Sequence, residues 1–369
     1  MAPGILRLMI GPGSSYTNDR LGRGEMPVYW SIRFGRRWAL ACCVALVVLC
    51  GVVVALAANQ SPPGASDKNY IKWVDFSPSY NAMAKALELD ITSHRSESPA
   101  PLDWVELLAC LGTRYGGDFS RYRQSHLLDI KSQLEEGKTP YEVTGQSKYY
   151  AYYEEAYRAV LGGFVGYYLR EKPDPDNPDR VIQAADYGLK VFHPLARGYG
   201  YSHSDDFGNS RSYGFRRQHL GHDLMASVGT PVVAVEGGVV EAAGWNQYGG
   251  WRIGIRSHDG LRYYYYAHLR KGHPYHPSVQ EGAVVEAGQV IGYLGMTGYS
   301  QKEDVNGMQV PHLHFGMQLI FDESQKDGNN EIWIDVYRIV TLLEKNRSSV
   351  IKEEEGKDYH RKYQFVPLE

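Results

Sequence analysis

Cysteine is nearly absent from this sequence outside one apolar run. Three of the four cysteines, Cys42, Cys43 and Cys50, lie in that run, and only Cys110 lies beyond it. The residues after the run therefore cannot form an intrachain disulfide among themselves, and no Cys-X-X-Cys or Cys–His zinc pattern is present. Any bound metal must be held by histidine and carboxylate side chains.

The sequence also lacks an excess of positive charge over most of its length. Of its 39 basic and 42 acidic residues, six arginines and two acidic residues fall within residues 1–37, which leaves 33 basic and 40 acidic residues from residue 38 onward. A segment with that net negative charge is a poor phosphate binder, so nucleic acid is not expected as a partner.

Only one long uncharged run is present, at residues 38–58, and it is rich in Val, Leu and Ala. As a helix it would span about 31 Å, which matches a hydrocarbon core of about 30 Å. Three arginines lie just before it, so the positive-inside rule places residues 1–37 in the cytoplasm and residues 59–369 outside. The run thus predicts a single-pass protein of the cell membrane, with the cytoplasmic membrane as a partner. A cleaved signal peptide is the alternative, since Ala55-Leu56-Ala57 offers small residues for cleavage, but the run exceeds the usual core of about 7–15 residues.

The pattern of apolar residues and turn residues changes several times along the remaining sequence, and these changes predict a multidomain fold. Apolar residues at helical spacing after residue 70 indicate an all-α middle domain, whereas short β-rich runs between glycine-containing turns indicate an all-β, antiparallel C-terminal domain. The expected parts are a basic cytoplasmic tail (1–37), a transmembrane helix (38–58), a linker (59–69), a helical domain (70–170), a Pro/Asp-rich linker (171–190), the β domain (191–320), and a C-terminal helix with a charged tail (321–369).

Histidine is concentrated in the β domain, which holds ten of the 13 histidines between His193 and His314. The segment His312-Leu313-His314 is typical of a strand, in which residues i and i+2 point to the same side. Two imidazoles on one face favour a metal site or a catalytic pair over a packing role, although two exposed surface histidines are the alternative. His268 is expected at a strand end, where sites often begin.

The order of several short motifs resembles peptidase family M23, the lysostaphin/LytM type. The resemblance covers residues 193–318, about a third of the chain, and no single motif carries it alone. The matching motifs are His219-Leu220-Gly221-His222-Asp223, Gly229-Thr230-Pro231-Val232, Tyr266-Ala267-His268-Leu269, Gly288-Gln289-Val290-Ile291-Gly292, Gly295-Met296-Thr297-Gly298 and His312-Leu313-His314-Phe315.

This resemblance implies one Zn²⁺ held by His219, Asp223 and His314, with His268 and His312 as catalytic histidines that do not bind the metal. The sequence departs from the family in two places. Residues 299–311 form a long segment where the family often has a short turn, and His222 stands where the family usually has an apolar residue. His222 could compete as a ligand, but a supporting or exposed position is expected. The remaining histidines of the β domain are expected at the surface or in local turns.

The resemblance further implies a zinc metalloendopeptidase that hydrolyses stem peptides or cross-bridges of peptidoglycan. No His-Glu-X-X-His motif is present, so no glutamate base is indicated. The alternative from another functional class is a membrane-anchored, LytM-like scaffold or regulator of other cell-wall machinery. Loss of metal ligands would favour that alternative, and here all of them are present.

Overall fold

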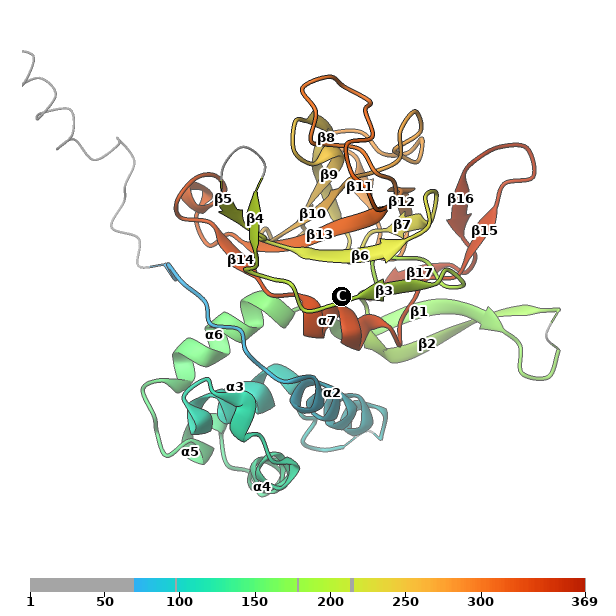
Figure 1. The fold of residues 1–369 in the computed structure, drawn as a ribbon. Helices are drawn as coiled ribbons and strands as arrows, with labels where there is room; N and C mark the ends of the chain where they lie inside the picture. The colour runs from blue at the N-terminus through green and yellow to red at the C-terminus, as the bar shows by residue number, and fades with distance from the viewer. Residues whose placement is uncertain (1–69, 97, 178, 213–215, 369) are drawn as a thin grey trace, which may run out of the picture. The chain divides into compact units, whose positions relative to one another are not determined.

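The computed structural model describes residues 70–96, 98–177, 179–212 and 216–368, all within one unit, Asn69–Glu369. Figure 1 shows a sheet with helices gathered on one side of it. The helices are α2 (Tyr80–Arg95), α3 (Trp104–Tyr115), α4 (Gln124–Glu135), α5 (Pro140–Val143), α6 (Tyr150–Leu161) and α7 (Tyr337–Leu343).

The helix α3 begins and ends at residues typical of helix ends. Asp103 begins α3 by accepting hydrogen bonds from the backbone N–H groups of Val105 and Glu106, and Gly116 ends it with a left-handed φ of 61°. The face of α3 that carries Leu107, Leu108 and Leu111 is buried. The helical domain was predicted as far as residue 170, but α6 ends at Leu161 and a strand begins at Val165.

An eight-stranded antiparallel sheet forms the C-terminal part and confirms the prediction of a β-rich domain there. Its strand order is β11-β8-β9-β10-β13-β6-β3, and β14 pairs with β13. The bounds are β3 (Tyr201–His203), β6 (His222–Ala226), β8 (Gly238–Asn246), β9 (Gly250–Ser257), β10 (Arg262–Ala267), β11 (Val284–Val285), β13 (His312–Leu319) and β14 (Ile332–Ile334).

Short two-stranded and three-stranded sheets flank this main sheet. The strands are β1 (Val165–Pro173), β2 (Val181–Leu189), β4 (Ser210–Ser212), β5 (Arg216–Gln218), β7 (Pro231–Val233), β12 (Val290–Tyr293), β15 (Val350–Lys352), β16 (Tyr359–Arg361) and β17 (Phe365–Pro367). They pair as β17-β1-β2, β12-β7, β15-β16 and β4-β5.

Two segments expected to be irregular are regular in the structure. The 171–190 linker instead contains the end of β1 and all of β2, which pair from Val165–Leu189 to Pro173–Val181, so its Pro/Asp-rich stretch is the tip of a hairpin. In the 321–369 segment, the predicted C-terminal helix is the short α7, and it follows the strand β14. The charged tail forms three strands instead of a solvated extension, because β17 pairs with β1 and buries Phe365.

The transmembrane helix expected at residues 38–58 lies outside the described residues. Among the residues that the structure describes, no helix is long and apolar enough to cross a membrane. The longest of them, α2, has 16 residues, which corresponds to about 24 Å against a hydrocarbon core of about 30 Å. The described part of the structure thus gives no support to the expected fold with a transmembrane helix or to the expected single-pass location at the cell membrane.

Candidate metal centre

The alternation of β13 determines which of its side chains reach the site. Leu313 and Phe315 point into the core and are buried, whereas His312 and His314 point to the opposite face, as the sequence predicted. Strand β6 runs beside β13 with Asp223 directly across from His314. His219 precedes β6 in the turn that follows β5. One strand pair and one turn thus bring together residues 219, 223 and 314.

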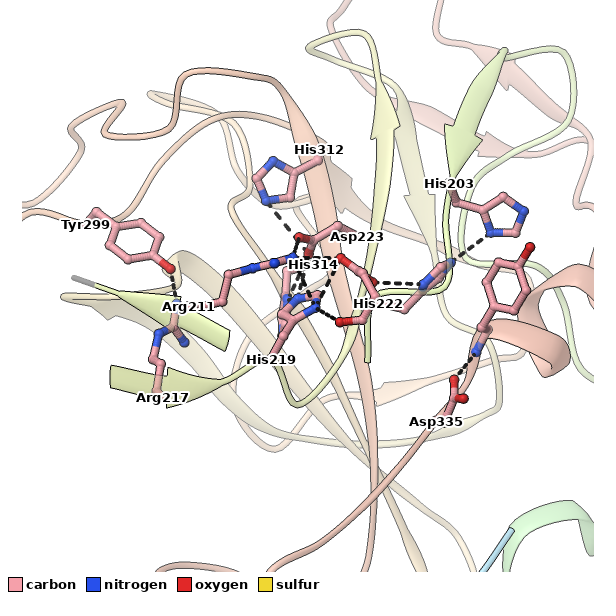
Figure 2. Close-up of polar contacts among 12 residues, drawn as sticks. His203, Arg211, Arg217, His219, His222, Asp223, Tyr299, His312, His314 and Asp335 are labelled. Carbon is pink, nitrogen blue, oxygen red and sulfur yellow. Dashed lines mark hydrogen bonds and ion pairs between the residues drawn. The ribbon is translucent and has the colours of Figure 1, made fainter. Parts of the chain in front are cut away.

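Three side-chain atoms from these residues converge on one point (Figure 2). Asp223 Oδ1 lies 3.0 Å from His219 Nε2 and 3.0 Å from His314 Nδ1, and the two nitrogens are 2.9 Å apart. Ligands of a tetrahedral zinc lie about 2.0–2.2 Å from the metal and hence about 3.3 Å from one another. The triangle therefore has nearly the dimensions that a zinc ion requires, and its donor set of two imidazoles and one carboxylate suits that metal.

Asp206, which the sequence analysis missed, supports the histidine at one corner of this triangle. His219 Nδ1 lies 3.2 Å from the Asp206 backbone oxygen and 3.2 Å from its carboxylate. An N–H donated there leaves the lone pair of the ring on Nε2, facing the other two donor atoms. A proton on either nitrogen would be donated to Asp223; without such protons the three atoms are all acceptors that repel one another at this spacing, so the geometry fits a bound cation.

The charges around the triangle keep its carboxylate ionised. Burial raises the pKa of Asp223, but hydrogen bonds from His219 and His314 outweigh burial and hold that pKa well below its usual range. Burial lowers the pKa of His219, yet its bonds to Asp206 and Asp223 raise it to about 9. Arg211 joins both carboxylates, at 2.7 Å from Asp206 and 3.3 Å from Asp223.

His222 does not join the triangle and is not exposed either. Its Nε2 lies 2.8 Å from Nδ1 of His203, and its Nδ1 lies 3.5 Å from Asp206 Oδ1. His222 is buried beneath the site and contacts the ring of Tyr337. The unusual histidine of the motif is therefore a buried neighbour of Asp206 that is hydrogen-bonded to His203. His193, expected near the surface, is also fully buried.

Gly221 is required in this turn by the ring of His314. A Cβ atom on Gly221 would lie 2.5 Å from Cε1 and 2.6 Å from Nε2 of that imidazole, a separation that non-bonded atoms do not tolerate. The glycine of the motif thus allows the turn and the strand to approach closely.

His268 and His312 face each other beside the triangle. Their ring centroids are 4.7 Å apart, and His312 Nε2 lies 3.9 Å from Asp223 Oδ1. His268 Nδ1 lies 2.8 Å from the Thr297 carbonyl, and His312 Nδ1 lies 2.8 Å from the Val310 carbonyl. Each ring therefore donates its Nδ1–H to the backbone and keeps a lone pair on Nε2.

The environment of His268 keeps its imidazole neutral. Burial and the neighbouring His312 and His314 lower its pKa to about 3, so the ring is neutral at pH 7. As predicted, it follows directly after a strand, β10. Its φ of 61° is left-handed, which is uncommon for residues other than glycine and clusters at functional sites.

The long segment 299–311 is held against the site by side-chain contacts. Arg217 donates to the Tyr299 hydroxyl and lies over its ring, with 5.4 Å between the guanidinium carbon and the centroid. Asp304 accepts hydrogen bonds of 2.8 Å from the Trp251 indole and from the backbone N–H of Gly272. This segment therefore forms a fixed wall next to His268.

Comparison with known proteins places the site within a known domain. Residues 217–327 match the model of peptidase family M23, and this segment contains all five residues discussed, namely His219, Asp223, His268, His312 and His314. The chain is 43% identical over 132 residues to the L-Ala–D-Glu endopeptidase of Bacillus subtilis, covering 36% of this chain and 39% of that protein. It is 39% identical over 99 residues to the peptidoglycan DD-endopeptidase ShyC of Vibrio cholerae, covering 27% of this chain and 20% of that protein.

Solved structures are similar to parts of this chain as well. The catalytic domain of the antimicrobial peptidase lysostaphin from Staphylococcus simulans is 33% identical, with a TM-score of 0.30, and the alignment covers 38% of this chain and 92% of that domain. The chain spans less than two thirds of the length of the two curated relatives above.

Proposed function

We propose that the M23 peptidase domain of this chain, residues 217–327, is a zinc-dependent endopeptidase that hydrolyses peptide bonds of peptidoglycan. The observation that carries the proposal is the triangle of His219, Asp223 and His314 with two further histidines beside it. The substrate class rests on the relatives, of which one is named a peptidoglycan DD-endopeptidase and another an L-Ala–D-Glu endopeptidase.

In this proposal, three of the residues bind the metal and two others orient them. His219 Nε2, His314 Nδ1 and an oxygen of Asp223 would hold the zinc ion, and three protein ligands are the number found in catalytic zinc sites. When bound, zinc supplies Lewis-acid chemistry, lowering the pKa of water and polarising the carbonyl of the scissile bond. Asp206 and Arg211 hold the ligands in orientation and are not ligands themselves.

The proton transfers belong to His268 and His312. Hydrolysis requires a group that takes a proton from the attacking water and a group that gives one to the leaving amine. Both rings present a free Nε2, and both are fixed by the backbone carbonyls that accept their Nδ1–H groups. The low pKa of His268 keeps that ring neutral at pH 7, so its Nε2 lone pair can accept a hydrogen bond from the attacking water.

Four single variants separate metal binding from catalysis. His314→Ala should lose zinc and activity together. His268→Ala and His312→Ala should keep zinc while hydrolysis falls by about 10²–10⁴, the usual cost of losing a general acid or base. His258→Ala removes an exposed histidine outside the site and should change neither property. The measurements are elemental analysis of zinc and release of peptides from purified peptidoglycan, with and without a chelator.

Two results would contradict the proposal. Full activity in both His268→Ala and His312→Ala would exclude this mechanism. A zinc-loaded protein that releases no peptide from the wall would favour the scaffold or regulator alternative.

A further inference from the structure

A groove of about 650 Å³ begins at His314 and crosses the outer face of the main sheet. Strand alternation places Tyr263 and Tyr265 of β10 along its floor, while Arg217 and Arg252 lie among its lining residues. In β9, Gly254 lies directly across from Tyr265 and makes room for the Tyr263 side chain, because a Cβ atom there would collide with the Tyr263 hydroxyl.

This groove is continuous with the metal centre. The Tyr265 ring lies 5.9 Å from the His314 ring and 6.3 Å from the Trp333 ring, so one aromatic side chain connects the candidate ligand to the far wall. A peptide bound at the triangle would therefore extend into the groove within one or two residues of the scissile bond, since each extended residue spans about 3.3–3.6 Å.

Two arginines of the groove have unused hydrogen-bonding capacity. The Nε atoms of Arg217 and Arg252 are buried and have no hydrogen-bond partner in the described part of the chain. Neither guanidinium forms an ion pair with a carboxylate there. Burial raises the pKa of Tyr265, and the hydrogen bond from Asn246 and the charges of Arg252 and Arg217 oppose that rise.

The other charged groups of the groove are engaged or exposed. Lys326 forms an ion pair of 2.7 Å with Glu241, and Glu331 accepts a hydrogen bond of 2.7 Å from the Trp333 indole. Asp327, the third carboxylate of the lining, is exposed to solvent. Arg217 and Arg252 are thus the positively charged side chains of the groove that have no carboxylate partner among the described residues. They lie at the end of the groove that adjoins the metal centre.

We propose that Arg252 and Arg217 form a carboxylate subsite, so that the peptide cut by this domain carries a free carboxylate next to the scissile bond. Planar guanidinium groups match carboxylate geometry, and charge-assisted hydrogen bonds are stronger where water is partly excluded. The inference rests on the proposed function and narrows it. The preferred substrate is an acidic wall peptide, such as one with γ-linked D-glutamate and a free α-carboxylate. A neutral glycine bridge or an amidated peptide fits the subsite less well.

Two peptides that differ in one functional group test this subsite. The first contains γ-linked D-glutamate with its α-carboxylate free, and the second carries the primary amide at that position. The parent protein should cut the acid with a kcat/KM about 10- to 100-fold higher, the effect expected of hydrogen bonds to a charged group, and mainly through KM. Arg252→Gln should abolish most of this preference, and Arg252→Lys should retain part of it.

Lys326→Gln provides the matched control, because it removes an equal charge from the same groove but one that is already paired. It should keep the preference of the parent protein. Equal cutting of the two peptides by the parent, or an unchanged preference in correctly folded Arg252→Gln, would overturn the subsite.

Failure of the proposed function gives a different result. If the zinc-loaded parent cuts neither peptide, the endopeptidase proposal fails, and calorimetric titration of both peptides into the parent then decides the subsite alone. Tighter binding of the acid would support the subsite, and equal binding would overturn it.

Discussion

The contact between Asp206 and His219 determines which nitrogen of that imidazole is free to bind a metal. Because Nδ1–H is directed to Asp206, the lone pair of Nε2 points at Asp223 and His314. Without the carboxylate, the ring could adopt the other tautomer or rotate away. Supporting contacts of this kind commonly change metal affinity by about 10–100-fold.

Replacement of Asp206 should therefore weaken zinc binding without removing a ligand. In Asp206→Ala, the zinc affinity is expected to fall by about 10–100-fold, measured by competition with a chromophoric chelator. Asp205→Ala is the control, since the neighbouring carboxylate is exposed. Unchanged affinity in Asp206→Ala would show that Asp223 and His314 orient His219 by themselves.

The sequence predicted the residues that would bind the metal, but it did not predict Asp206, which orients His219. The spacing of His312 and His314 fixes a common strand face, because the side-chain period of a strand is two. Asp206 lies 13 residues before His219 and is returned to it by the β4–β5 hairpin, whose strands have three residues each. Strands so short leave no readable alternation. The only available signal was the run His203-Ser204-Asp205-Asp206, rich in potential ligands, just before the motif.

Among the contacts that hold the segment 299–311, those of Asp304 connect it to two other parts of the fold. Asp304 has a φ of 59° and bonds to both the Trp251 indole and the Gly272 backbone, so it links the segment to β9 and to the turn after His268. The segment gives the site its wall through Tyr299, whose ring lies 6.0 Å from that of His268.

Loss of this anchor should affect substrate binding more than metal binding. In Asp304→Ala, KM should rise several-fold while zinc content stays at the parental value, because the wall loosens but the triangle does not change. Steady-state kinetics and elemental analysis on the same preparations test this. Glu303→Ala, at the exposed neighbouring position, should behave as the parent. Parental kinetics in Asp304→Ala would mean that the wall does not contact substrate.

The C-terminal strand β17 was not predicted from the sequence, because it lies in a segment of charged composition. Its residues follow a charged stretch, and its partner β1 lies about 195 residues earlier, so nothing local indicates the pairing. Phe365 fills the space between Tyr168 and Phe192, at centroid distances of 4.7 and 5.1 Å. A small apolar core thus fixes the chain end to the first hairpin.

Truncation of that aromatic side chain should destabilise the protein strongly. Phe365→Ala is expected to lower the free energy of unfolding by about 3–5 kcal/mol, the usual cost of emptying a buried phenylalanine site. Val366→Ala changes the adjacent residue of the same strand, which is 46% exposed, and should cost much less. Denaturant titration compares the two. Equal effects would indicate that β17 contributes pairing but no core.

At the scale of the whole molecule, the helices and the main sheet are one structure and not two independent modules. Leu107 and Leu313 belong to the same buried cluster, and α2 packs against α7. Buried Arg262 bonds to the Ala159 carbonyl at the end of α6 and to Glu236 beside the sheet. The sequence predicted a helical part and a β-rich part but not that they share one core, because contacts between residues about 100 positions apart produce no periodic pattern in the sequence.

His193 makes the stability of this whole structure depend on pH. Burial lowers its pKa to about 4, below the value of about 6.5 expected in the unfolded chain, so the unfolded state binds the proton first as pH falls. The contribution of His193 to the free energy of unfolding is complete above pH 6.5 and declines as pH falls from 6.5 to 4. About 2 kcal/mol of it is lost by pH 5 and about 3 kcal/mol below pH 4.

Denaturant unfolding at pH 7.5 and pH 5 should therefore show a larger decrease in the free energy of unfolding for the parent than for His193→Gln, by about 2 kcal/mol. The metal-centre histidines titrate in both proteins, so their contribution cancels in this difference, provided that both carry the same zinc content. Equal decreases would mean that His193 is protonated as readily in the folded protein as in the unfolded chain.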